Sequence, residues 1–207
     1  MIWLGSTSLK DTFPQLFIIE SLTFDDERDG RLEGDIFRDI LRLSCRDVEY
    51  LYIRTARELE VAIERFCESR KRYLHISSHG NDHSLALTLD SLTFAEFADL
   101  VKPAMSERRL FVSACEAVNP QLAAAILPDS GCYSLVGCRD HISFGDAAMM
   151  WASFYHLMLR DPDAEEIKGG KIRWGLRRLK KAFGVDFAYF KPSQGPSGFE
   201  SVNIEVK

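Results

Sequence analysis

Two short apolar segments, each running directly into a chemically reactive side chain, constrain this chain more than any other feature. The first begins at Tyr73 and ends at His79 and Gly80, and the second begins at Leu110 and ends at Cys115. Short continuous apolar runs of this kind are typical of buried strands. In a parallel α/β sheet the carboxyl ends of neighbouring strands lie side by side. The histidine and the cysteine can therefore meet although 36 positions separate them in the sequence.

The remaining segments supply the strands and helices that such a sheet needs. Helix starts are marked by capping residues, and the predicted helices carry apolar residues at helical spacing. Strands are predicted at residues 16–20, 48–54, 84–89, 134–138 and 201–206, and helices at 36–41, 55–67, 93–101, 119–126, 146–159 and 172–183. The acidic residues 21–35 are predicted to form a loop. This alternation predicts an α/β fold with a mostly parallel central sheet.

Composition limits the functional classes. The chain has 207 residues, of which 46% are hydrophobic and 28% charged, and we expect one domain over residues 1–207. A net charge of -5 gives no general attraction to nucleic acid, and no apolar run reaches the roughly 20 residues of a membrane span. Residues 1–20 lack the pattern of a secretion signal. We therefore expect no nucleic-acid partner and no membrane span.

The cysteines argue against a disulfide scaffold. Five is an odd number, and their spacing has no tight framework, which favours a reducing, cytoplasmic compartment. Four of them are interpreted as small core residues, namely Cys45, Cys67, Cys132 and Cys138.

The fifth cysteine, Cys115, has a histidine to activate it. A free thiol has a pKa near 8.5 and is mostly protonated at neutral pH, so it needs a neighbouring base to become a nucleophile. His79 is the candidate base. Either residue alone is more often a packed side chain, but the two in matching strand-end contexts favour catalysis. His83 follows His79 in a segment that reads as a turn, and the ligand spacing of a zinc site is absent, so no metal is expected.

The sequence motifs at these strand ends resemble those of a known protein family. The strand ending in His79 and Gly80, the strand ending in Ser113, Ala114 and Cys115, and the strand and helix that follow resemble the caspase-like cysteine peptidases of clan CD. The likeness is closer to their bacterial branch, the CHAT domains, and covers residues 12–160. It implies a three-layer sandwich with a mostly parallel central sheet flanked by helices.

The resemblance also implies a reaction. Cys115 would attack a peptide carbonyl to form a thioester acyl-enzyme, and His79 would act as acid and base. The backbone N–H groups of Gly80 and Cys115 would form the oxyanion hole. No cofactor is implied, and the oligomeric state is left open.

The expected partner is a protein or peptide substrate. By resemblance this is a gasdermin-like pore-forming protein encoded nearby, in antiviral defence or regulated cell death. The main alternative is a caspase-like adaptor whose dyad is inactive. A nucleotide-binding fold is disfavoured because no glycine-rich phosphate loop follows a strand.

Acidic residues near the expected cleft suggest a specificity. We predict that Asp25, Asp26, Ser113 and Asp146 bind substrate, with a preference for a basic P1 residue before the scissile bond. The acidic side chains are equally compatible with a solvated loop, and Asp146 with a helix N-cap. Arg139 could instead select an acidic residue.

A Lys/Arg-rich helix over residues 172–183 is most simply a solvated helix face. A surface for nucleic acid, membrane or an acidic partner is the alternative, and Trp174 marks either a contact or the core.

Overall fold

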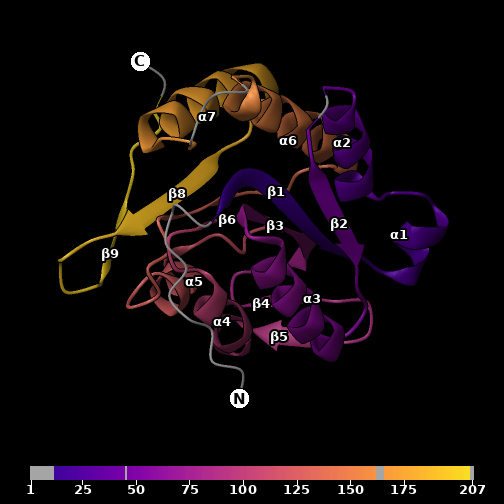
Figure 1. Cartoon of the computed structure of the whole chain (residues 1–207), viewed down its shortest axis with the longest axis horizontal. Helices are drawn as coiled ribbons and strands as arrows, with labels where there is room; N and C mark the ends of the chain where they lie inside the picture. Colours follow the sequence, from indigo (N-terminus) through magenta and orange to yellow (C-terminus); the bar gives the residue numbers. More distant parts are fainter. Residues whose placement is uncertain (1–11, 45, 162–165, 206–207) are drawn as a thin grey trace.

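The structure is a computed structural model that describes residues 12–44, 46–161 and 166–205 (Figure 1). Its centre is a sheet with the strand order β2-β1-β3-β6-β7-β8-β9, and the short strands β4 and β5 extend from β3. The strands are β1 (Phe13–Ser21), β2 (Val48–Tyr52), β3 (Lys71–Gly80), β4 (Ser84–Ala86), β5 (Ser91–Thr93), β6 (Arg109–Ser113), β7 (Ser134–Cys138), β8 (Phe187–Pro192) and β9 (Phe199–Ser201). Strands β2, β1, β3, β6 and β7 pair in parallel.

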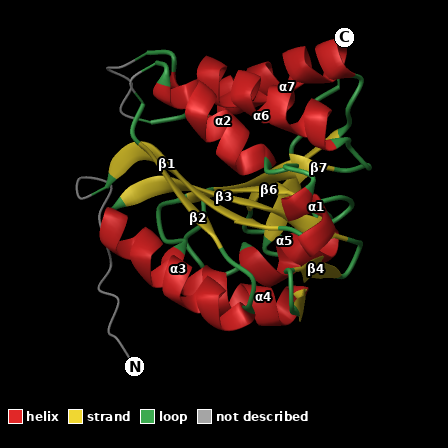
Figure 2. Ribbon diagram, turned by 90° about the vertical axis from the view of Figure 1, so that its right-hand side faces the viewer, coloured by secondary structure: helices red, strands yellow, loops and turns green. Residues whose placement is uncertain are grey.

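Helices cover both faces of the sheet (Figure 2). They are α1 (Phe24–Arg28), α2 (Glu33–Arg42), α3 (Ala56–Ser69), α4 (Phe94–Val101), α5 (Pro120–Ile126), α6 (Phe144–Leu159) and α7 (Gly169–Phe183), with a 3₁₀ turn η2 (Lys102–Ala104) after α4. In Figure 2, α2, α6 and α7 lie above the sheet, and α3, α4 and α5 lie below it. The three-layer α/β sandwich predicted from the sequence is confirmed.

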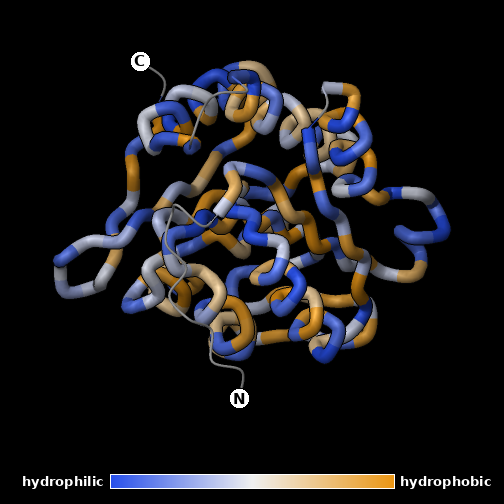
Figure 3. The backbone as a smooth tube through the Cα atoms, viewed as in Figure 1, coloured by the Kyte–Doolittle hydropathy of each residue, from blue (hydrophilic) through white to orange (hydrophobic). Residues whose placement is uncertain are grey.

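Each face of the sheet has its own hydrophobic core. Along β1, Phe17 and Ile19 belong to the core under α3, α4 and α5, and Leu16 and Ile18 belong to the core under α2, α6 and α7. This is the period-two alternation of a strand that is buried on both sides. Hydrophobic residues are accordingly gathered in the central strands in Figure 3, and the projecting α1 segment is largely hydrophilic.

Local capping fixes the helix starts that the sequence predicted. The capping boxes at Thr55 and Thr93 are both formed, with Glu58 and Glu96 as their partners at the third residue of each helix. Each box satisfies backbone N–H groups that the first helical turn leaves without partners. The start of α5 is likewise confirmed, with Asn119 as its cap.

Three local predictions were wrong. The acidic segment at residues 21–35 holds the short helix α1 and the start of α2, because one helical turn is too short to show an apolar period. The side chain of Ser143, not that of Asp146, caps α6. The strands near residues 84 and 201 are only three residues long. The antiparallel strand β8, which the sequence analysis did not predict, pairs with β7.

The structure can also be searched for a membrane-spanning helix and for a metal-binding cluster. Within the described residues no helix combines the length and apolar character of a membrane span, and no group of three His, Cys, Asp or Glu side chains is arranged to hold a metal ion. Cys132 and Cys138 are buried as expected, and burial raises the pKa of Cys132 to about 11. Cys67 is half-buried, and Cys45 lies outside the described residues.

Candidate active site

His79 lies near the carboxyl end of β3, and Cys115 lies in the turn directly after the neighbouring parallel strand β6. The pairing of β3 with β6 runs up to Ser77 opposite Ser113. Each of the two reactive residues lies two positions further along its own chain segment. Because strand side chains alternate with a period of two, this places His79 on the same face as Ser77. Both reactive residues are partly exposed to solvent.

Close packing behind the two residues holds the two segments together. A Cβ atom on Gly80 would lie 3.1 Å from the Cβ of Ala114, 3.3 Å from that of Ala117 and 3.3 Å from the carbonyl oxygen of Ser84. Such distances are tighter than ordinary carbon contacts. Gly80 therefore lets the segment after His79 lie directly against the segment around Cys115.

Asn119 ties the same two segments by hydrogen bonds. Its Nδ2 donates to the carbonyl oxygen of Asp82 at 2.8 Å and to that of Glu116 at 3.1 Å. Its Oδ1 accepts from the backbone of Gln121 and Leu122 at the start of α5. Glu116 adopts a left-handed backbone with φ of 59°, which is uncommon outside glycine. The turn after Cys115 is thus held by specific bonds to its surroundings.

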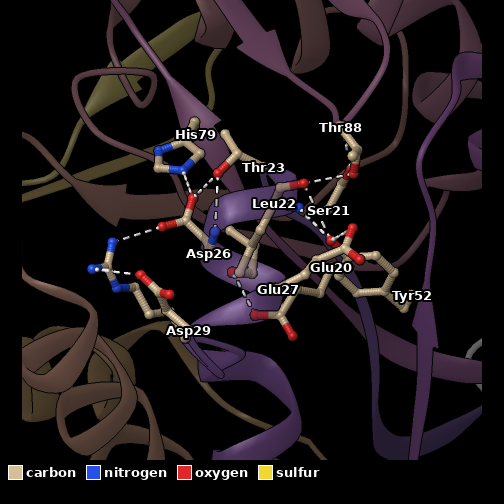
Figure 4. A network of polar contacts seen from close by, with 12 residues as sticks. Glu20, Ser21, Leu22, Thr23, Asp26, Glu27, Asp29, Tyr52, His79 and Thr88 are labelled. Atoms are coloured by element: carbon tan, nitrogen blue, oxygen red, sulfur yellow. Dashed lines mark hydrogen bonds and ion pairs between the residues drawn. The ribbon is translucent and has the colours of Figure 1, made fainter.

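Asp26 is the hydrogen-bond partner of His79 (Figure 4). Its Oδ2 lies 2.7 Å from Nε2 of His79, and its Oδ1 lies 3.0 Å from Nη1 of Arg31. The hydroxyl of Thr23 also donates to Oδ2. Asp26 is buried, with only 5% of its surface exposed. Burial by itself would raise the pKa of Asp26, but the bonds from Thr23, His79 and Arg31 outweigh it and lower the pKa to about 2.

The ionised carboxylate determines which nitrogen of His79 carries the proton. A carboxylate can only accept, so Nε2 must donate to it. In the neutral imidazole this leaves Nδ1 with a free lone pair, available to take a proton. The ring is further held by Phe144, whose ring lies edge-on at a centroid distance of 5.6 Å. Asp26 and Phe144 together orient the imidazole.

A row of buried polar groups lies one step further from the edge of the sheet. Glu20, Ser77 and Ser113 are register partners on β1, β3 and β6. The Ser77 hydroxyl donates to Oε1 of Glu33 at 2.8 Å and is 3.3 Å from Oε1 of Glu20. Glu33, at the start of α2, also binds Ser113. Two buried carboxyl groups thus lie directly behind the row that holds His79.

The environment of these carboxyl groups favours their neutral forms. Burial raises the pKa of Glu33 to about 7, with a further rise from the charge of Glu20 and opposition from the Ser113 and Ser77 hydroxyls. Burial likewise raises the pKa of Glu20, against hydrogen bonds from the backbone of Gly34 and the hydroxyl of Tyr50. The pair therefore stays protonated to a higher pH than two exposed glutamates would.

The predicted substrate-binding residues are not brought together. Asp25 is exposed and pairs with Arg28 at 2.8 Å. Asp26 is buried with its oxygens occupied, and Ser113 is buried against Glu33. Asp146 is exposed and accepts from Ser143 at 2.8 Å. The contacts of Asp26 suit a residue that orients His79 better than one that binds substrate, and the other three assignments stay predictions.

The sequence contained one signal for the role of Asp26. Thr23 and Asp26 have the spacing of a capping box, and the Thr23 side chain does accept from the Asp26 backbone at 3.2 Å. That signal fixes a helix start but not the direction of its carboxylate. Glu20 and Glu33 had no signal of their own, because neither their burial nor their proximity can be read from spacing.

Comparison with known proteins places the fold. No family model and no curated protein sequence matches the chain. Among solved structures, the Arg-specific cysteine proteinase gingipain R matches with a TM-score of 0.55 and 11% identity, over 84% of this chain and 44% of that one. Caspase-1 from Spodoptera frugiperda matches with a TM-score of 0.45 and 14% identity, over 72% of this chain and 71% of that one.

This chain therefore spans less than half of the gingipain R chain. At such low identity the likeness concerns the arrangement of strands and helices, and the parallel order and flanking helices agree with it. The protein thus shares its fold, a mostly parallel sheet between two layers of helices, with gingipain R.

Proposed function

We propose that the protein is a cysteine endopeptidase in which Cys115 is the nucleophile and His79 the acid and base. One observation carries the proposal. His79 and Cys115 each lie two residues past the last register pair of the neighbouring parallel strands β3 and β6, and Nε2 of His79 is bound by a buried, ionised Asp26. This arrangement supports a Nδ1 atom that is free to exchange a proton with the thiol. The fold shared with gingipain R adds to the support.

The proposed reaction has two halves. Nδ1 of His79 takes the proton of the Cys115 thiol, and the sulfur attacks the carbonyl carbon of the scissile peptide bond. The N–H groups of Gly80 and Cys115 stabilise the oxyanion. The C–N bond then breaks, and His79 gives its proton to the leaving amine. In the second half His79 takes a proton from water, and the resulting hydroxide attacks the thioester. The C–S bond breaks to release the carboxylic acid, and the proton on His79 returns to the Cys115 thiolate.

Cleavage of a randomised peptide library by the purified chain tests this proposal. We expect the wild type to cleave, and the variants Cys115→Ala and His79→Ala to lose the activity, while Cys67→Ala keeps it. Without cleavage by any form, selective alkylation of Cys115 by a thiol-directed peptide electrophile would indicate a latent enzyme. If the chain shows neither cleavage nor selective alkylation, it is an inactive binding module and the proposal is refuted.

The preferred P1 residue is proposed to be basic. Most acidic side chains between positions 20 and 35 are already paired with arginines of this chain, namely Asp25, Asp26, Glu27, Asp29 and Asp35. In the described part of the chain, Glu20 and Glu33 have hydroxyl and N–H donors but no ion pair. A basic P1 side chain that reached this buried pair would supply a cation and favour its ionised form over the neutral one. Gingipain R, with the same fold, is an Arg-specific proteinase.

The same library separates this preference from the activity itself. We expect Glu33→Gln to lower the ratio of cleavage after Arg or Lys to cleavage after neutral residues by about tenfold or more, since one lost charge pairing is worth about 1.4 kcal/mol or more when partly desolvated. Asp25→Asn, which removes an exposed and already paired carboxylate, should leave the ratio unchanged. A neutral or acidic P1 preference in the wild type contradicts the assignment but not the dyad.

The protein substrate is proposed from the family resemblance alone. It is a gasdermin-like pore-forming protein encoded nearby, cleaved in the cytoplasm during antiviral defence. Incubation of the candidate with wild type and with Cys115→Ala tests this, and a single cleavage that requires Cys115 is the expected result. An intact candidate beside an active peptidase would exclude it as the substrate.

A further inference from the structure

The exposed face of α7 carries a dense set of positive charges around a tryptophan. Between Ile167 and Phe183 the chain has seven basic residues and no acidic one, although the chain as a whole has a net charge of -5. The apolar side of the helix is buried in the core through Ile172, Leu176 and Leu179. We define the basic strip as the exposed residues Arg173, Trp174, Arg178 and Lys181 together with the half-buried Arg177.

The other helices of this protein arrange their charges differently. On α2, Arg38 pairs with Asp35 and Asp39, and on α3, Arg57 pairs with Glu60. Exposed helices commonly intersperse both signs in this way, because opposite charges three or four residues apart stabilise a helix. In the basic strip the four cations have no ion pair within the described residues, whereas Lys180, outside the strip, is held by Asp186.

The charge pattern of α7 disfavours the free helix. Arg173, Arg177 and Lys181 follow one another at four-residue spacing, where like charges repel. Lys168 precedes the helix without a capping side chain, and Lys171 lies in its first turn, where the helix dipole disfavours cations. Only Lys180 and Lys181, in the last turn, are placed where the dipole favours them. A pattern that weakens the helix in isolation is better explained by an anionic ligand that relieves the repulsion.

Trp174 distinguishes between classes of anionic ligand. The residue is 44% exposed, and the guanidinium of Arg178 lies 4.4 Å from the centroid of its ring. One face of the indole is therefore covered, and a nucleic-acid base cannot stack on that face. An exposed indole beside cations is suited to the interface between water and lipid headgroups. The helix α7 belongs to the layer of helices on one face of the sheet (Figure 2), and the exposed residues of the strip are on the side of the helix opposite its buried stripe.

We propose that the basic strip of α7 docks this protein onto an anionic phospholipid surface. The arginines and the lysine pair with lipid phosphates, and Trp174 enters the headgroup layer. In Figure 1, α7 lies on a different side of the molecule from α1, which carries Asp26, so the edge with His79 and Cys115 stays open when the strip is occupied. The proposal does not depend on peptidase activity.

Co-sedimentation with vesicles tests the docking. The wild-type chain is expected to bind phosphatidylcholine vesicles that contain phosphatidylserine, not vesicles of phosphatidylcholine alone, and to release as salt screens the charges. The variant Arg173→Glu, Arg178→Glu, Lys181→Glu should bind at least about 100-fold more weakly, since each cation near such a surface contributes about fivefold. Circular dichroism checks that the variant is folded.

A matched variant on the opposite face controls for net charge. Arg57→Glu, Arg65→Glu, Lys102→Glu makes the same charge change on α3 and on the turn after α4, and should retain more of the binding than the strip variant by about tenfold or more. A blue shift of tryptophan emission on binding should be absent in Trp174→Phe. Three results would overturn the proposal. They are an equal loss of vesicle binding in both triple variants, binding to an oligonucleotide or to polyglutamate in preference to the vesicles, and no binding to vesicles at all.

Discussion

At the residue scale, the contact between Asp26 and His79 links the local fold to the proposed chemistry. The carboxylate is buried, accepts from Thr23 and Arg31 as well as from the imidazole, and has a pKa lowered to about 2. It therefore stays ionised at any pH at which the enzyme would work. An ionised partner fixes the tautomer of the histidine without itself taking a proton.

Replacement of this partner should impair turnover more than binding. We expect Asp26→Asn to lower kcat by about 100-fold or more with little change in KM, because an amide no longer selects the tautomer with a free Nδ1. Steady-state kinetics measures the change, and nitrogen NMR of His79 should show a loss of the Nε2–H form. Asp29→Asn, which contacts Arg31 but not His79, is the control. Equal kcat in both variants would contradict a positioning role.

At the element scale, the start of α2 is built over a polar layer of the sheet. Glu33 is buried at the first turn of α2 and binds the hydroxyls of Ser77 on β3 and Ser113 on β6. Glu20 on β1 accepts from the backbone N–H of Gly34 in the same turn at 2.8 Å. The helix is thus attached to three strands by polar contacts. Its attachment depends on the protonation of the two carboxyl groups.

Stability should therefore fall as the pH rises. The folded pKa of Glu33 is about 7, above its ordinary value of 4.5, so its contribution is fully present below about pH 4.5 and is lost as the pH rises through about 7. This shift corresponds to about 3 kcal/mol. Urea unfolding at about pH 5 and about pH 8 measures it as the difference between wild type and Glu33→Gln. Parallel pH dependence in the two proteins would contradict the assignment.

At the scale of the whole molecule, one sheet separates two hydrophobic cores. The strands β1, β3 and β6 contribute side chains to both cores, so neither core can form without the sheet that also supports the other. Within the described residues the two cores are therefore coupled through one sheet, while the single domain over residues 1–207 stays a prediction. Such a domain unfolds as one cooperative unit when its parts are strongly coupled.

A mutation in one core should be detected from the other. Phe66→Ala lies in the core under α3, and we expect it to lower the free energy of unfolding by about 3–5 kcal/mol. Trp151 reports from the opposite core, and its emission can be followed after Trp3 and Trp174 are replaced by Phe. The Trp151 transition should shift together with far-UV circular dichroism. An unshifted Trp151 transition would indicate two independent units.

The sequence by itself determined the alternation of strands and helices. Capping boxes, apolar periodicity and the two strand-end residues depend on neighbours within about one helical turn or one strand, and these signals are local. They predicted β7 at the residues observed, the starts of α3, α4 and α5, and the positions of His79 and Cys115 at neighbouring strand ends. They did not predict β8, whose pairing with β7 joins distant segments.

Tertiary structure alone decided the roles of the acidic residues. Asp25, Asp26 and Glu33 look alike in an acidic segment, yet one is exposed, one binds His79 and one is buried over two serines. The same holds for α7, whose apolar stripe was evident while the exposure of Trp174 was not. Burial and long-range hydrogen bonds set the charge and the partner of each group, and both depend on residues that only folding brings together.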